Sequence, residues 1–380
     1  MPAYRLAALA ALTTPLVLSG CSSAEPGAGA AAGAGRIAVT ATEETCEIAR
    51  TELRAGTQTF AVRNDGEQVT EFYVYEGQKV VGEVANVEPG ETDDLTVDLD
   101  KGDYEGACKP GVKGDMTRDI RTAITVVGTS DELATDDPKL AAAVTHYNRY
   151  VATEADALVV QTEKFVGLIK AGKVEEAKRL FPVARVHWER IEPVAEIFGD
   201  LDPAIDAREN DVEPGTKFTG FHRLEKDLWV TKDVSTSGET ADKLLTDVKK
   251  IVQLAKDEQL KPFQLANGSK ELLDEVATTK ITGEEDRYSH TDLWDFAANV
   301  EGSKAAIDAL RPALAERDPR LLRELDTQFA KVAKVLDKHR KGTGFKLHTE
   351  LSKGELRELS DAINALGEPV SKVAAAIATK

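Results

Sequence analysis

Carboxylates gather around a histidine in the middle of the sequence. Glu189 and Glu192 are three positions apart. His222 and Glu225 have the same spacing, and Asp206 lies in an acidic segment, interpreted as a loop, between the two pairs. In a helix, residues three apart project from one face, so each pair could hold a cation between its side chains. Because oxygen and imidazole ligands suit a hard or borderline cation, this spacing predicts metal binding.

The same carboxylates also have a simpler interpretation. Glu189 and Glu192 could form a solvated helix face together with Arg185 and Arg190. His187 lies about 140° from the apolar stripe of its predicted helix at 100° per residue. We therefore expect His187 at the surface or in packing, not among metal ligands. At this level, a metal site and a solvated face both remain open.

Motifs of common hydrolases and nucleotide-binding proteins are missing from the sequence. It contains no His-Glu-x-x-His segment, no Gly-x-Ser-x-Gly elbow and no P-loop. A zinc-dependent metallopeptidase using His222 and Glu225 is an alternative function, but no further histidines stand at ligand spacing. A polysaccharide-binding or adhesion protein is a second alternative, which the low aromatic content of 6% disfavours.

Residues 36–128 have the pattern of a β domain. Turn-forming Asn, Asp, Gly and Pro residues separate short runs with alternating or β-branched character. Many short strands in a segment of this size predict an all-β sandwich. The predicted strands include residues 37–40, 58–62, 71–75, 95–99 and 122–127.

After a linker at 129–138, the apolar period becomes helical. Residues 139–380 are predicted to form an all-α helical bundle, so the chain is multidomain. Pro182 and Pro193 predict a kink or break in the second helix, and Pro369 predicts one in the last. The predicted helices run from Leu140 to near Gly172 and over 174–198, 217–231, 238–260, 269–280, 290–315, 319–340 and 353–378.

The first residues predict export. Residues 1–20 read as a signal peptide, with basic Arg5 followed by an apolar stretch too short to span a bilayer. The stretch ends in Leu18-Ser19-Gly20-Cys21, which resembles the bacterial lipobox, in which the cysteine carries lipid. Residues 21–35 would form a flexible tether. We expect an exported protein that is lipid-anchored on the outer face of the cytoplasmic membrane or periplasmic; an ordinary secretory signal is the alternative.

Charge and cysteine content agree with this location. The 48 basic and 66 acidic residues leave a net charge of −18, which disfavours nucleic acid as a partner. Besides Cys21, the chain contains only Cys46 and Cys108. In an oxidising compartment two such cysteines most often pair. The competing interpretation is that both thiolates bind a metal.

Three blocks of sequence resemble a known family. Residues 220–225, Gly-Phe-His-Arg-Leu-Glu, resemble the Gly-x-His-x-x-Glu signature of imelysin-like proteins. Residues 188–196 and 288–296 are similar to further blocks of the iron-uptake branch, and the preceding β domain resembles a cupredoxin. The resemblance implies an extracytoplasmic iron-binding lipoprotein, not an enzyme, which passes iron to a membrane iron permease and works beside a haem-containing peroxidase.

The resemblance also implies which residues bind metal. The cofactor would be iron, with Zn²⁺ or Cu²⁺ tolerated because affinity follows ligand type. Residues 36–128 contain no histidine, which excludes a type-1 copper site in that domain alone. The implied site of the helical domain comprises Glu189, Glu192, Asp206, His222 and Glu225. A possible second site in the β domain comprises Cys46, Glu71, Glu83 and Cys108.

Overall fold

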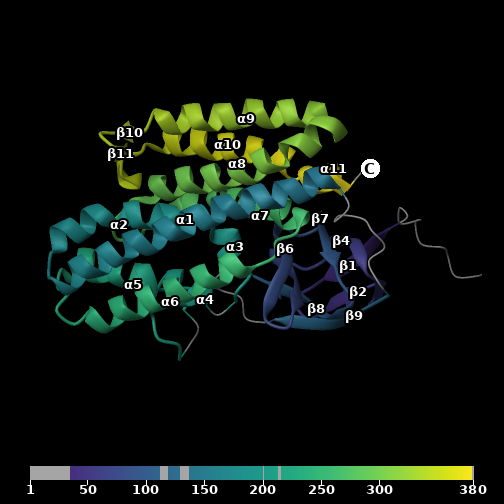
Figure 1. The fold of residues 1–380 in the computed structure, drawn as a ribbon, viewed down its shortest axis with the longest axis horizontal. Coiled ribbons are helices and arrows are strands. Elements are labelled where there is room, and N and C mark those ends of the chain that lie inside the picture. Colours follow the sequence, from purple (N-terminus) through teal and green to yellow (C-terminus); the bar gives the residue numbers. More distant parts are fainter. Residues whose placement is uncertain (1–34, 112–118, 129–136, 200, 213–214, 379–380) are drawn as a thin grey trace, which may run out of the picture. The chain divides into compact units, whose positions relative to one another are not determined.

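The computed structural model describes residues 35–111, 119–128, 137–199, 201–212 and 215–378. Strands occupy the first part of the chain and long helices the second, drawn in Figure 1 in purple to blue and in teal to yellow. This order confirms the predicted fold class of a β part followed by a helical part. The predicted signal peptide and Cys21 lie outside the described residues, as do nearly all of the predicted tether and most of the predicted linker.

Two sheets enclose one apolar core in the β part. Phe60 from the first sheet and Phe72 from the second lie in this core with their ring centroids 5.5 Å apart. The first sheet has the order β2 (Cys46–Ile48), β1 (Arg36–Ala41), β4 (Gly56–Asn64) and β7 (Thr92–Leu99). The second has the order β3 (Glu52–Arg54), β9 (Ile120–Val127), β8 (Gly102–Pro110), β5 (Thr70–Glu76) and β6 (Lys79–Val87).

A disulfide joins the two sheets. Cys46 begins β2 of the first sheet, Cys108 lies in β8 of the second, and their sulfur atoms are 2.03 Å apart. The sequence left open whether these cysteines form a disulfide or bind a metal, and in the structure they form a disulfide. Both residues are buried, so the bond is part of the sandwich core.

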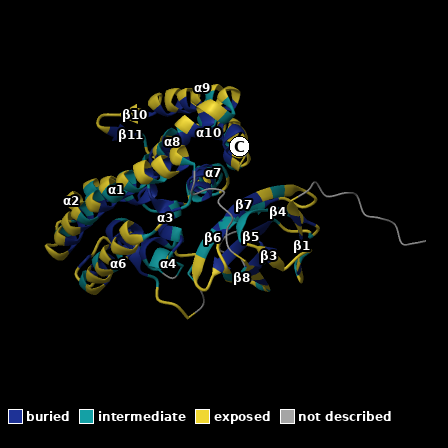
Figure 2. Cartoon of the chain, turned by 45° about the vertical axis from the view of Figure 1, so that its right-hand side comes forward, coloured by how far each residue is buried: buried dark blue, intermediate teal, exposed yellow. Residues whose placement is uncertain are grey.

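The helical part packs around its own core. Helix α1 lies against α2, α6 and α8, and α7 lies between α8 and α10. Buried and exposed stripes alternate along α1 in Figure 2, as expected for an amphipathic helix. The α-helices are α1 (Pro138–Lys170), α2 (Val174–Glu189), α3 (Glu192–Glu196), α4 (Leu201–Asp206), α5 (Gly220–Lys226), α6 (Gly238–Asp257), α7 (Pro262–Thr278), α8 (Asp292–Arg317), α9 (Pro319–Asp337), α10 (Lys353–Val370) and α11 (Val373–Ala378).

Smaller elements complete the helical part. A π-helical turn, Asp227–Thr231, continues α5. A 3₁₀ turn, Lys280–Thr282, follows α7, and a second one, His348–Glu350, follows a short hairpin. That hairpin consists of β10 (Arg340–Lys341) and β11 (Gly344–Phe345).

Some predicted boundaries differ from the structure. The break predicted in the helix at 174–198 is confirmed near Pro193: α2 ends at Glu189, and a new helix, α3, begins at Glu192, with Pro193 in its first turn, where a missing N–H costs least. Pro182, in contrast, lies inside an unbroken α2. The acidic segment at Asp206 was interpreted as a loop, which is wrong, because residues 201–206 form α4.

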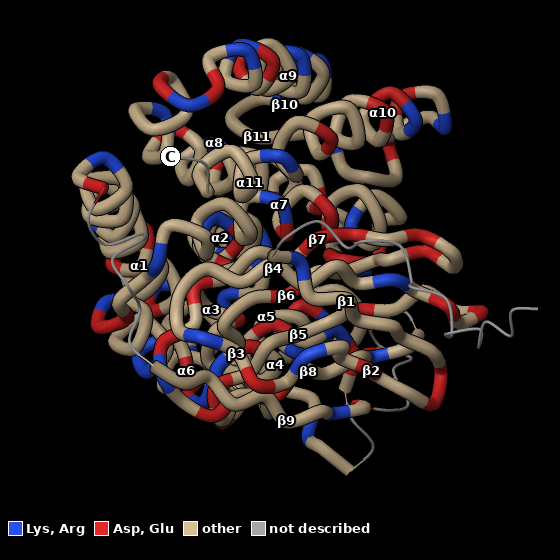
Figure 3. The backbone as a smooth tube through the Cα atoms, turned by 90° about the vertical axis from the view of Figure 1, so that its right-hand side faces the viewer, with Lys and Arg blue, Asp and Glu red and all other residues tan. Residues whose placement is uncertain are grey.

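Charges of both signs share the surface helices. Both α9 and α10 carry Lys and Arg as well as Asp and Glu (Figure 3). Neither helix therefore presents the continuous basic face that binds nucleic acid. In the part of the chain that the structure describes, no helix has both the length and the apolar content to cross a membrane.

Candidate metal centre

Buried charges collect where α2, α4, α5 and the start of α8 meet. None of these residues is more than 8% exposed. Carboxylates outnumber basic groups among them, so the surroundings favour a bound cation. We call this set the charged cluster: Arg185, Glu189, Glu192, Asp206, His222, Glu225, Lys280, Glu285, Asp286, Asp292 and Asp295.

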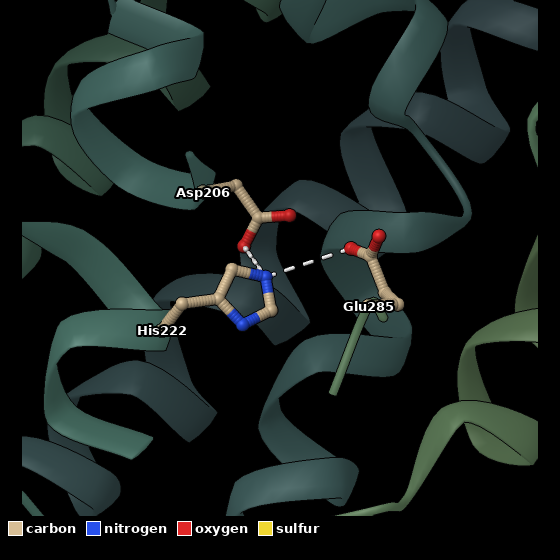
Figure 4. Close-up of side chains that lie close together, drawn as sticks. All are labelled: Asp206, His222 and Glu285. Atoms are coloured by element: carbon tan, nitrogen blue, oxygen red, sulfur yellow. Dashed lines mark ion pairs between the residues drawn. The ribbon is translucent and has the colours of Figure 1, made fainter. Parts of the chain in front are cut away.

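The imidazole of His222 lies at the centre of the cluster. Its Nε2 atom is 3.7 Å from Oδ1 of Asp206 and 3.5 Å from Oε1 of Glu285. Figure 4 shows both carboxylates directed at this one nitrogen. Among the described residues, Nε2 has no hydrogen-bond partner, although it is buried. A buried nitrogen without a partner that faces two carboxylate oxygens is arranged to bind a metal ion.

The ligand atoms are spaced for one ion. Donor atoms bound about 2.1 Å from a shared ion lie roughly 3.0–3.4 Å apart, depending on geometry. The two separations around Nε2 are only a few tenths of an ångström longer. The three donor atoms of Asp206, His222 and Glu285 also lie within 4.8 Å of one another. Small side-chain movements would therefore complete the coordination.

Glu225 lies on the other side of the ring. Its Oε2 is 3.2 Å from Nδ1 of His222, and its Oε1 accepts the backbone N–H groups of Tyr288 and Ser289 at 3.0 and 2.7 Å. A carboxylate held in this way fixes the tautomer and orientation of a metal-binding histidine. Glu225 and His222 also form a possible metal group with Asp286. Because Nδ1 already has a partner and Nε2 has none, the Nε2 side fits an ion better.

Gly220 allows α5 to approach α4 closely. Its φ is +84°, and a Cβ atom placed there would lie 2.1 Å from the carbonyl oxygen of Ile205. Beside it, the Thr219 hydroxyl donates to the carbonyl oxygen of Ala204 at 2.8 Å. This contact brings Asp206 to His222. The glycine of the Gly-x-His-x-x-Glu pattern thus has a structural role that only glycine meets without strain.

We expect Gly220→Ala to lower the free energy of unfolding by about 2–3 kcal/mol, from backbone strain and the clash with Ile205. Metal affinity should fall as well, because α4 must move away from His222. The control is Gly167→Ala in α1, where nothing lies within 4 Å of the added Cβ and a small gain in stability is expected. Denaturant unfolding and metal titration of both variants measure the effects; an unchanged Gly220→Ala protein would contradict this role.

Glu189 and Glu192 contact basic side chains in the structure, not His222. Lys280 Nζ donates to Glu189 Oε2 at 2.7 Å and to Glu192 Oε2 at 2.8 Å. Asn299 donates to both carboxylates from α8. The alternative of a solvated face is wrong, since Arg185 and Glu189 are fully buried. Of the five residues implied by the family resemblance, only Asp206 and His222 share the Nε2 site.

Glu285 is the possible metal ligand that the sequence analysis did not identify. It precedes the block at 288–296 that carried the family resemblance, in the acidic run Glu284-Glu285-Asp286. Only the fold brings this run to α4 and α5. Arg185 and Lys280 were also missed as cluster members, because spacing alone does not show that a basic side chain is buried. The acidic run was the one sequence signal that could have pointed to Glu285.

The cluster favours the imidazolium form of His222. Burial and Arg185 lower the pKa of His222, but Asp206, Glu225 and Glu285 raise it by more, to about 10. Burial raises the pKa of Glu285, yet Lys280 and His222 bring it well below its ordinary value. Charges inside the cluster thus already pair with one another.

The four-residue site implied for the β part is not assembled. Cys46 and Cys108 are bonded to each other, so neither offers a thiolate. Cys108 pairs with Phe72 and faces the sandwich core. Glu71 is adjacent to Phe72 along β5, so its side chain leaves the opposite face of the sheet. It accepts a hydrogen bond from Tyr73, which is opposite Glu83 on β6. The carboxylates and the sulfur atoms therefore cannot share an ion.

Comparisons with known proteins agree with this architecture. The family model described as Imelysin matches residues 143–373, and the Cupredoxin-like domain model matches residues 8–126. The iron uptake system component EfeO of Escherichia coli O157:H7 is 40% identical over 349 residues, covering 89% of this chain and 90% of the relative. EfeO of Shigella flexneri is 39% identical over the same length and coverage. This chain is similar to these relatives over both of its parts.

Proposed function

The chain belongs to the imelysin family, and from this premise we propose that it is an extracytoplasmic iron-binding component of an iron uptake system. Two relatives that match this chain over 90% of their own length are named as the iron uptake system component EfeO. In this proposal residues 139–380 form the iron-binding domain and residues 36–128 a cupredoxin-like domain. The protein binds its cargo and does not transform it, so no catalytic residue is assigned.

The observation that carries the proposal is the buried Nε2 atom of His222, which lacks a hydrogen-bond partner among the described residues and faces Asp206 and Glu285. Two carboxylates and one imidazole form a hard to borderline donor set that suits iron. We propose these three side chains as ligands and Glu225 as the group that orients the imidazole. Glu189 and Glu192 would act from a second layer, through Arg185 and Lys280. Zn²⁺ and Cu²⁺ should compete for the same atoms.

Location and partners complete the proposal. Lipid attached at Cys21 would hold the protein at the outer face of the cytoplasmic membrane. Iron would then pass to a membrane iron permease, with a haem-containing peroxidase in the same system. The placement rests on the signal and lipobox pattern of the sequence, and the partners on the family resemblance.

The proposal predicts a large difference between two neighbouring glutamates. Glu285→Gln should weaken ferrous iron binding by more than about 100-fold, beyond the loss typical of an outer-layer partner. Glu284→Gln should bind like the wild type, because the Glu284 side chain is 61% exposed and its ion-pair partner is Arg287, which is outside the charged cluster. Anaerobic calorimetric titration of both variants and the wild type measures this. Equal affinities in all three proteins would remove the proposed site.

A further inference from the structure

This inference rests on the proposed function and concerns Arg185, a fully buried member of the charged cluster. Its Nη1 donates to Oδ1 of Asp206, and its Nη2 donates to Oε1 of Glu285 at 3.0 Å. These are the same two oxygen atoms that face Nε2 of His222. The guanidinium therefore occupies the ligand atoms that an iron ion would need.

An iron ion and this guanidinium cannot share these oxygens at full strength. Two cations a few ångström apart in a buried site repel each other strongly, since little water screens them. The ion also needs the lone pairs that now accept hydrogen bonds from Arg185. Binding of iron at His222 therefore requires that Arg185 weaken or break its hydrogen bonds to Asp206 and Glu285.

The structure offers the guanidinium other acceptors nearby. Its Nε atom is 3.3 Å from Oδ1 of Asp286 and 3.5 Å from Oδ1 of Asp295, and it makes no hydrogen bond to any described residue. Asp295 is fully buried, and within the described part of the chain neither of its oxygens accepts a hydrogen bond. A short shift of Arg185 toward these two aspartates would give its Nε atom and their free oxygens hydrogen-bond partners.

Aromatic rings border the guanidinium. The rings of Phe181 and Phe221 have their centroids 5.8 and 5.9 Å from its central carbon. Such rings attract a cation without offering it a hydrogen-bond acceptor. They therefore favour the buried charge in either position and do not hold it to Asp206.

We propose that Arg185 is a displaceable counter-cation, which neutralises Asp206 and Glu285 in the metal-free protein and moves toward Asp286 and Asp295 when iron binds. Its return would help to expel the ion when a partner takes it. Arg185 thus sets the affinity of the site at a level that permits release. It is a positioning residue and not a ligand.

The test measures ferrous ammonium sulfate binding under anaerobic conditions, by calorimetry and by the rise in melting temperature. Arg185→Gln should bind about tenfold or more tightly than the wild type, which is 1.4 kcal/mol or more, although the metal-free variant should melt earlier. Arg185→Lys keeps the charge and should lie between the two. The control is Arg190→Gln, since Arg190 pairs with Glu154 and Glu301 outside the cluster; its affinity should be that of the wild type.

A second variant covers the case in which Arg185→Gln fails to fold. Asp295→Asn keeps the size of the side chain but removes the carboxyl group toward which Arg185 would move, so it should bind iron more weakly. Equal or weaker binding by a folded Arg185→Gln, or unchanged binding by Asp295→Asn, would overturn the inference. Wild-type protein that binds no iron, or that binds it independently of Glu285, would instead defeat the proposed function itself.

Discussion

Replacing His222 with alanine should weaken ferrous iron binding by at least about 1,000-fold, or about 4 kcal/mol. The variant loses the imidazole nitrogen around which Asp206 and Glu285 are arranged. It also loses the partner that Glu225 orients. The remaining carboxylates would stay paired with Arg185, so they cannot rebuild the site. Anaerobic titration with ferrous iron measures the loss.

His187→Ala is the matched control for this experiment. His187 lies in the same helix as Arg185, but its Nδ1 contacts Glu154 at 2.7 Å, outside the charged cluster. Its removal should leave iron affinity unchanged. If the two alanine variants bind iron equally well, His222 is not a ligand. Circular dichroism of both variants shows whether the helices persist.

Replacing Lys280 with methionine should lower the free energy of unfolding by about 3–5 kcal/mol, the cost of leaving buried charges without their partner. Lys280 is 1% exposed and lies within 3.1 Å of carboxylate oxygens of Glu189, Glu192 and Glu275. Burial lowers the pKa of its ammonium group, but these carboxylates raise it well above the ordinary value. The ammonium is therefore charged at neutral pH, and removing it leaves these carboxylates without their cation.

Two further variants separate this cause from lost packing. Lys304→Met removes an exposed lysine paired with Asp308 and should change stability by no more than about 0.5 kcal/mol. Adding Glu192→Gln to Lys280→Met removes one of the stranded charges and should restore part of the stability. Urea unfolding of the three proteins measures the differences. A double variant less stable than Lys280→Met alone would mean that packing dominates.

The fold was largely predictable because its signals are local. Alternation in strands such as β1 and the helical period of α1 follow directly from the sequence. The change from strands to helices, and with it the fold class, was predicted correctly for this reason. The segment at Asp206 was not, because its short helix packs against Gly220, fourteen positions after Asp206.

The site was only partly predictable, because it is assembled from distant segments. His222 was identifiable from a known pattern, and Asp206 from its acidic context. Glu285 and Arg185 are a hundred positions apart and meet only in the folded chain. Glu189 illustrates the limit: its spacing suggests a ligand, whereas its contacts with Arg185 and Lys280 place it in a second layer. Spacing on one helix cannot show which charge a carboxylate meets across the core.

The most direct test of the account is diffraction at the iron absorption edge from crystals soaked anaerobically in ferrous iron. We predict one anomalous peak in the helical part, about 2.2 Å from His222 Nε2, Asp206 Oδ1 and Glu285 Oε1. A peak on the Nδ1 side between Glu225 and Asp286, or one among Glu192, Glu196 and Glu275, would contradict this site, since both groups could also hold an ion.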